Sequence, residues 1–132
     1  VFGYPFDKRV SRFEEALTIV HGLLREGRVD FAGTFHEARD CALRPRGPRP
    51  SGPPLTIGST GERMLPMLAR NGDVWNAWAR QSVAVVRAER AHGDAALERN
   101  GRDPSTVART VCLLVDAPMR GGRPSEPRLG TG

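Results

Sequence analysis

The sequence predicts an α/β fold in which parallel strands alternate with helices. Three short apolar segments, at residues 55–57, 74–75 and 110–115, have the composition of buried strands. Helical patterns fill the chain between them, at about residues 61–71 and 81–100. Two strands joined by one helix form a βαβ unit, whose strands run parallel, so we expect one parallel sheet.

An amphipathic helix is expected ahead of this sheet. Ser11 and Glu14 have the spacing of a capping box, which predicts that the helix begins at Ser11. Apolar residues then recur at spacings of three and four, and Gly27 is expected to end the helix. Residues 29–36 carry apolar residues at alternate positions around Gly33, which predicts either a short hairpin or an extended excursion with a turn at that glycine.

Prolines indicate a connector, a disturbed turn inside one predicted helix and the start of a short helical turn. Residues 44–54 contain five prolines, which exclude a helix or a central strand and predict an extended connector across a surface. Pro66 falls inside the helix predicted at 61–71, where it should cost or kink a turn. Asp103 followed by Pro104 is the order of an N-cap and a first helical residue, so a short helical turn is expected there.

The end of the chain divides into a last strand and a tail. Residues 110–115 are a nearly unbroken apolar run, which is typical of a strand covered on both faces. Residues 117–132 are rich in proline, glycine and arginine, and we expect them to be disordered or loop-like. The predicted domain therefore spans residues 1–116. Because the chain opens on Val1, we expect it to be a piece of a longer protein.

The composition argues against nucleic acid and membrane partners. The formal net charge is +5, but the twenty basic residues, of which Lys8 is the single lysine, are interspersed with fifteen acidic ones. Few aromatic residues are available to stack on bases. No apolar run is long enough to predict a membrane span. Cys41 and Cys112 form no CxxC pair, and isolated thiols of this kind are typical of a reducing cytoplasm.

The turn after the first predicted strand is the leading candidate for a binding site. It consists of Gly58, Ser59, Thr60 and Gly61, and we name it the 58–61 turn. The unpaired N–H groups and the positive dipole end of a helix start suit an anion such as phosphate. An ordinary strand-to-helix turn with a Ser or Thr cap is the alternative, because such caps form without a ligand.

A second candidate lies on the next predicted strand. Ligands of parallel α/β folds bind at the carboxyl ends of the strands, so Trp75 and Asn76 are expected beside the 58–61 turn, as a wall of a substrate pocket. Trp78 is a further candidate for this wall. The alternatives are packing inside the fold for Trp75 and exposure to solvent for Trp78. No metal site is expected, because His36 and its acidic neighbours do not supply three or four convergent ligands.

Four segments, in this order and at this spacing, resemble one family. They are residues 2–6 with 12–17 (FGYPF and RFEEAL), residues 29–35 (VDFAGTF), residues 53–61 (PPLTIGSTG), and residues 73–76 with 101–104 (DVWN and GRDP). Together they resemble the luciferase-like monooxygenase superfamily, which comprises flavin- or deazaflavin-dependent oxidoreductases built on a (β/α)8 barrel. The resemblance covers about residues 1–116. A complete barrel needs about 250 residues, so the resemblance implies an incomplete TIM barrel.

The resemblance implies a cofactor and a division of roles between residues. The cofactor would be FMN or the deazaflavin coenzyme F420. The sequences of the WNAW and GRDP segments are most similar to the deazaflavin branch of the family. Gly58, Ser59, Thr60 and Gly61 would hold its ring edge or phosphate, and Trp75 and Asn76 would contact a small organic substrate. The hydride or oxygen chemistry belongs to the cofactor, so no acid–base pair is expected from the sequence.

A non-enzymatic alternative stays open. An incomplete α/β barrel exposes the backbone groups of its outermost strands, and such edges favour association with another chain. The chain would then act as a binding or assembly module, with a homo-oligomer as one possible outcome.

Overall fold

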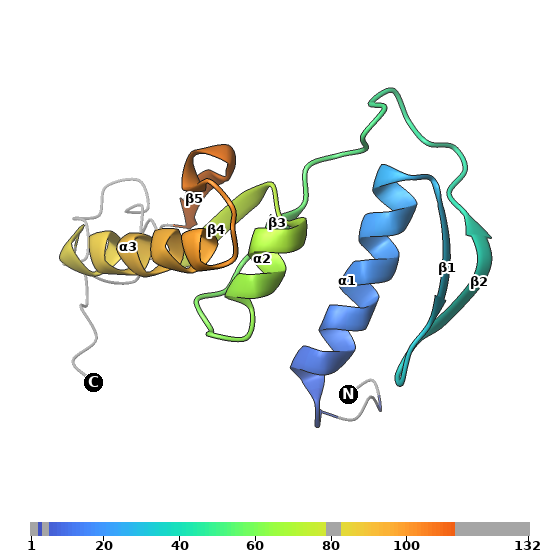
Figure 1. Ribbon diagram of the computed structural model, residues 1–132, viewed down its shortest axis with the longest axis horizontal. Helices are drawn as coiled ribbons and strands as arrows, with labels where there is room; N and C mark the ends of the chain where they lie inside the picture. Colours follow the sequence, from blue (N-terminus) through green and yellow to red (C-terminus); the bar gives the residue numbers. More distant parts are fainter. Residues whose placement is uncertain (1–2, 4–5, 79–82, 113–132) are drawn as a thin grey trace, which may run out of the picture.

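The computed structural model describes residues 3, 6–78 and 83–112 of the 132-residue chain. Its elements, in chain order, are α1 (Arg9–Arg25), β1 (Arg28–Ala32), β2 (Glu37–Ala42), β3 (Thr56–Ile57), α2 (Leu65–Asn71), β4 (Val74–Trp78), α3 (Val83–Arg99), the 3-10 helix η1 (Pro104–Thr106) and β5 (Ala108–Cys112). Figure 1 shows α1 standing between the β1–β2 hairpin and α2, with the remaining strands beyond α2. The predicted tail at 117–132 lies outside the described residues.

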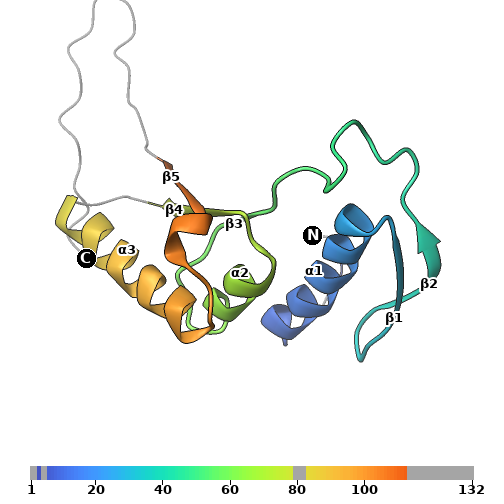
Figure 2. The same cartoon turned by 45° about the horizontal axis from the view of Figure 1, so that its top comes forward.

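A three-stranded parallel sheet organises the second half of the chain. The strand order is β3–β4–β5, and both neighbouring pairs are parallel. Helices α2 and α3 pack on one face of this sheet, as Figure 2 shows. The prediction of parallel strands alternating with helices is therefore confirmed, and the described chain is a mixed α/β structure.

The hydrophobic core lies between this sheet and its helices. Side chains that are nearly inaccessible to solvent come from both layers: Ile57, Leu65, Met67, Leu68, Trp75, Leu97 and Val107. Trp75 packs directly against α3, because a β-carbon at Gly93 would overlap the six-membered ring of the indole. Glycine at position 93 is thus required by close packing rather than by backbone conformation.

Helix α1 begins earlier than the capping box predicts. Its first residue is Arg9, and Lys8 at the N-cap makes no side-chain capping bond, so the prediction of a cap at Ser11 is wrong. The Ser11 hydroxyl instead accepts a hydrogen bond from Nη2 of Arg63 at 3.0 Å. The Glu14 carboxylate pairs with Arg70 on α2 at 2.6 Å. Both side chains therefore bond to residues in or just before α2 instead of capping α1.

Two sets of hydrogen bonds satisfy the backbone carbonyl groups at the C-terminal end of α1. Gly27, at φ +82°, donates its N–H to the carbonyls of Gly22 and Leu23, which confirms the predicted helix end. The guanidinium of Arg46 donates to the carbonyls of Leu24, Arg25, Glu26 and Pro50 at 2.9–3.4 Å. The proline-rich connector at 44–54 has no helix or strand, as predicted, and Arg46 ties it to the end of α1.

The predicted hairpin is confirmed, and its second strand is longer than expected. Strands β1 and β2 pair antiparallel, and Gly33 donates its N–H to the carbonyl of His36 at 2.9 Å across the turn. Strand β2 continues to Ala42. Its charged residues obscure the alternation of polar and apolar positions that would have predicted this length from the sequence. The hairpin turn is held to α1 by Glu15, whose carboxylate accepts hydrogen bonds from the N–H groups of Thr34, Phe35 and His36 at 2.8–2.9 Å.

Two other sequence predictions need correction. Helix α2 begins at Leu65, not near residue 61, so Pro66 lies in its first turn, where a missing N–H costs nothing and no kink follows. Strand β5 spans Ala108–Cys112, and its residues Thr110, Val111 and Cys112 are exposed, so coverage on both faces is wrong for the described part of that strand. Helices of the described chain cover one face of the sheet alone. The Asp103 cap of η1 is confirmed by its acceptance of the Ser105 N–H at 2.8 Å.

We predict that Gly93→Ala destabilises the protein. Overpacking a core typically costs about 1–3 kcal/mol, whereas helix propensity alone would stabilise the variant by about 1 kcal/mol. The sign of the change in the free energy of unfolding, measured by urea denaturation, distinguishes the two effects. Gly22→Ala is the control, because its β-carbon would lie 3.2 Å from a Val29 methyl group that can move. A Gly93→Ala variant more stable than wild type would contradict the packing of Trp75 on α3.

We also predict that Glu15 makes stability depend on acid pH. Desolvation would raise the pKa of Glu15, but the N–H groups of Phe35, Thr34 and His36 outweigh it and hold this pKa below its ordinary value. A pKa lowered by folding contributes stability above the unfolded value of about 4.3, and this contribution is lost as the pH falls through the folded pKa. Glu15→Gln should therefore lower Tm at pH 7, and its difference from wild type should shrink between about pH 5 and pH 3.

The exposed Glu98 of α3 provides the control for this experiment. Glu98→Gln should change Tm little at any pH in the same range. A Glu15→Gln difference that stays constant from pH 7 to pH 3 would contradict the role of the carboxylate at the hairpin turn.

Candidate functional site

The parallel register brings the predicted site segments to one edge of the sheet. Ile57 pairs with Trp75, and Trp75 with Arg109, so Gly58 follows β3 at the level of Asn76 on β4. A β-carbon at Gly58 would lie 3.7 Å from the Asn76 carbonyl oxygen and 3.9 Å from its Oδ1. The expected juxtaposition of the 58–61 turn with Trp75 and Asn76 is therefore present at the carboxyl ends of the strands.

The Trp75 side chain anchors the 58–61 turn from the core side of the sheet. The indole N–H donates to the carbonyl of Ser59 at 2.8 Å, and the Ser59 hydroxyl accepts the N–H of Gly61 at 3.2 Å. Gly58, Thr60 and Gly61 are exposed, and Ser59 is half-buried. The turn therefore presents small residues and hydroxyl groups to solvent while its backbone is anchored to the core.

The relation of this turn to α2 differs from the prediction. Gly61 is separated from the first residue of α2 by residues 62–64, and its carbonyl accepts the N–H groups of Met64 and Leu65 at 2.8 and 3.2 Å. The prediction that the turn forms the start of the helix is wrong, so the helix dipole gives no argument for an anion at residues 58–61.

The two residues predicted to line a substrate pocket face opposite sides of the sheet. Trp75 is 2% exposed and packs in the core toward α3, which is the packing alternative. Asn76, the next residue along β4, points to the face that α2 and α3 leave open. Its Nδ2 donates to Oγ1 of Thr110 on β5 at 2.8 Å. A role of either residue in substrate binding stays a prediction.

Thr110 is a member of this edge that the sequence did not indicate. Its backbone is in register with Asn76, and the two positions are 34 residues apart in the chain. No spacing rule in the sequence reports a cross-strand pair of this kind, because the register depends on how β4 and β5 align. Trp78 ends β4, where its backbone pairs with Cys112.

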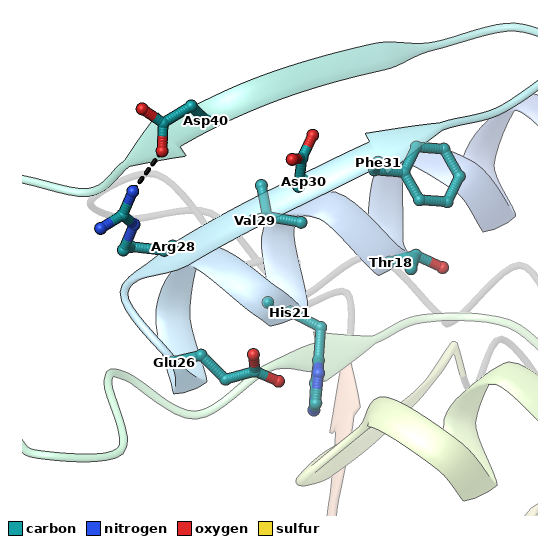
Figure 3. A pocket seen from close by; sticks show the side chains of 9 residues that line it. Thr18, His21, Glu26, Arg28, Val29, Asp30, Phe31 and Asp40 are labelled. Carbon is teal, nitrogen blue, oxygen red and sulfur yellow. Dashed lines mark hydrogen bonds and ion pairs between the residues drawn. The ribbon is translucent and has the colours of Figure 1, made fainter.

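A hollow lies between α1 and the hairpin, apart from the 58–61 turn. Its lining includes Thr18, His21, Glu26, Arg28, Asp30 and Asp40, and Figure 3 shows Arg28 and Asp40 turned toward each other while His21 points away from that ion pair. None of these residues belongs to the 58–61 turn or to the strands of the parallel sheet. Within residues 3, 6–78 and 83–112, no three His, Cys, Asp or Glu side chains are grouped so as to hold a metal ion.

A parallel sheet with helices on one face defines a mixed α/β domain, with polar groups at the carboxyl edge of its strands. The family model described as luciferase-like monooxygenase matches residues 1–117 of the 132-residue chain. The chain belongs to this family. A comparison with curated proteins gave no match. Membership indicates an oxidoreductase-type function, and members of the family commonly use flavin-type cofactors. The described helices include none that is both long and apolar enough to cross a membrane.

We predict that Trp75→Phe loosens the 58–61 turn while it preserves most of the core. Phenylalanine keeps an aromatic ring against α3 but has no N–H for the Ser59 carbonyl. Removal of one partner of a part-buried hydrogen bond costs about 1 kcal/mol, and hydrogen exchange at the Gly61 amide, which donates to the Ser59 hydroxyl, should become faster than in wild type. Unchanged exchange at the Gly61 amide in a destabilised Trp75→Phe variant would show that other contacts hold the turn.

Proposed function

We propose that the chain is part of a flavin- or deazaflavin-dependent oxidoreductase, in which FMN or coenzyme F420 contacts the 58–61 turn and a small organic substrate lies beside Asn76. The observation that carries this proposal is the convergence of the turn and Asn76 at one edge of the sheet, where a β-carbon at Gly58 would lie 3.7 Å from the Asn76 carbonyl oxygen. Carboxyl edges of parallel sheets are where α/β proteins bind cofactors and substrates. Family membership supports the same class of chemistry.

The residues of the turn fit the ring edge or the phosphate of such a cofactor. In the part of the chain that the structure describes, the backbone N–H groups of Ser59 and Thr60 have no acceptor from the protein. The exposed Thr60 can add a hydroxyl donor, and Gly58 leaves the backbone accessible because it has no side chain. When bound, the cofactor would supply the hydride or oxygen chemistry. The turn would orient it, with Trp75 acting through the Ser59 carbonyl.

Two of the segments that resemble the deazaflavin branch are structural in this chain. In the GRDP segment, Arg102 donates to the carbonyl of Ala69 at 3.1 Å, and Asp103 caps η1 ahead of β5. In the WNAW segment, Trp75 packs in the core. Neither contact discriminates between FMN and coenzyme F420, so both cofactors belong in the test.

We place the described sheet in an incomplete (β/α)8 barrel. Support comes from the parallel order β3–β4–β5 and from the face of the sheet that α2 and α3 leave uncovered. In a barrel such a face lines the interior, where layers of side chains meet below the ligand site.

A non-catalytic binding or assembly module is the second candidate function. It is favoured by β5, which has β4 as its one partner among the described strands and in which Val111 is 44% exposed. An exposed strand edge with an apolar side chain favours pairing with another chain, including a second copy of this one.

Titration of the 132-residue chain with FMN and with coenzyme F420 tests the proposal. We expect saturable changes in cofactor absorbance or fluorescence with at least one of them. Gly58→Ala should bind that cofactor about tenfold more weakly, a loss of about 1.4 kcal/mol. Its methyl group would sit at the edge in ordinary van der Waals contact with Asn76, so the fold should be preserved.

Thr56→Val is the matched control, because Thr56 is an exposed residue on the same face of β3, two positions before Gly58. It should bind as wild type does. Equal affinity of Gly58→Ala and wild type would contradict the placement of the cofactor at the turn. Failure of both cofactors to bind the wild-type chain would contradict the oxidoreductase site and favour the assembly module, which sedimentation would then detect as self-association.

A further inference from the structure

Asn76 and Thr110 form a polar pair on the open face of the parallel sheet. They lie in register on neighbouring strands, on the face opposite to Trp75 and Arg109. Arg109 is turned toward the helices, where it pairs with Asp94 and donates to the carbonyl of Pro104 at 3.0 Å. The open face at this level is therefore occupied by an amide and a hydroxyl group.

One hydrogen bond fixes the orientation of the Asn76 amide. Nδ2 donates to Oγ1 of Thr110 at 2.8 Å, which leaves Oδ1 and one N–H of the amide for other partners. Oδ1 lies on the Gly58 side, 3.9 Å from the β-carbon position of that glycine. Because Thr110 Oγ1 accepts from the amide, its own hydrogen remains available for donation. The pair thus offers a hydrogen-bond acceptor beside hydrogen-bond donors.

This pair is uncharged, and so are its neighbours on the same face. Alternation along the three strands places on this face Thr56, Gly58, Val74, Asn76, Ala108, Thr110 and Cys112. Among these described residues none is cationic. A carboxylate or phosphate at this point would therefore gain no counter-charge from the described residues of this face, and it would face the lone pairs of Oδ1. A hydroxyl group avoids both costs, because it donates one hydrogen bond and accepts others.

We infer that Asn76 and Thr110 form a subsite for an uncharged hydroxyl group of the substrate. Oδ1 of Asn76 accepts the hydrogen of that hydroxyl, and the Thr110 hydroxyl donates to its oxygen. Thr110 also positions the amide, so it selects which group of Asn76 faces the ligand. The inference rests on the proposed function, because it treats the carboxyl edge beside the 58–61 turn as the place where substrate lies.

Nuclear magnetic resonance of the 15N-labelled chain tests the subsite with two probes of matched size, cyclohexanol and cyclohexanecarboxylate. We expect cyclohexanol to shift the Asn76 side-chain amide signals saturably, and cyclohexanecarboxylate to leave them unchanged at the same concentrations. Thr110→Val should weaken the response to cyclohexanol at least about fivefold, which corresponds to about 1 kcal/mol. Thr110→Ser, which keeps the hydroxyl, should stay within about twofold of wild type.

Thr56→Val is again the control on the same face, and it should respond as wild type does. Asn76→Leu provides a second route should Thr110→Val fail to fold. It should abolish the shift that cyclohexanol causes at the backbone amide of Thr110. A Thr110→Val chain that binds cyclohexanol as wild type does would overturn the inference, and so would stronger binding of the carboxylate or the absence of any cyclohexanol shift in wild type.

The outcomes of this experiment can be distinguished from those of the cofactor titration. A chain that binds FMN or coenzyme F420 but shows no cyclohexanol shift contradicts the hydroxyl subsite and leaves the cofactor site standing. A chain that shows the cyclohexanol shift but binds neither cofactor supports the subsite and contradicts the cofactor assignment.

Discussion

The indole of Trp75 connects the hydrophobic core to the candidate site. Its ring fills the space that the absence of a side chain at Gly93 leaves on α3, and its N–H holds the Ser59 carbonyl at 2.8 Å. Because the ring is fixed by packing, the 58–61 turn inherits a defined position relative to the sheet. The next residue, Asn76, emerges on the opposite face, so one dipeptide both anchors the turn and supplies a polar group beside it.

Most of the residues that resemble the family build the scaffold rather than the site. Glu14 pairs with α2, Glu15 binds the hairpin turn, and Asp73 accepts the Leu55 N–H at 2.7 Å while it pairs with Arg25 at the end of α1. The Glu14–Arg70 and Arg25–Asp73 ion pairs join the two halves of the described chain. In this chain the residues that resemble the family therefore mostly hold α1, the hairpin and the sheet together, whereas the proposed chemistry depends on the few polar groups at the carboxyl edge.

Local sequence patterns predicted which helices and strands form better than they predicted where these elements end or which residues they contact. The periodicity of α1, the glycine of the hairpin and the apolar strands were sufficient, because these features act within a few residues. The predicted capping box does not form. The side chains of Ser11 and Glu14 instead accept hydrogen bonds from Arg63 and Arg70, which are more than fifty residues away in the chain. Thr110 could not be found from the sequence, since its contact with Asn76 depends on the register between β4 and β5. The apolar run that begins at Thr110 predicted coverage of both faces, but apolar composition alone does not specify which neighbours a strand obtains.

Nuclear Overhauser contacts in the 132-residue chain test most directly whether the core and the carboxyl edge are joined as described. We expect cross-peaks between the Trp75 indole N–H and protons of Ser59 and Thr60, together with cross-peaks between the Asn76 side-chain amide and the Thr110 methyl group. The indole N–H should also exchange slowly with water. An indole proton that exchanges freely, with neither set of cross-peaks, would contradict the assembly of the 58–61 turn, Asn76 and Thr110 at one edge.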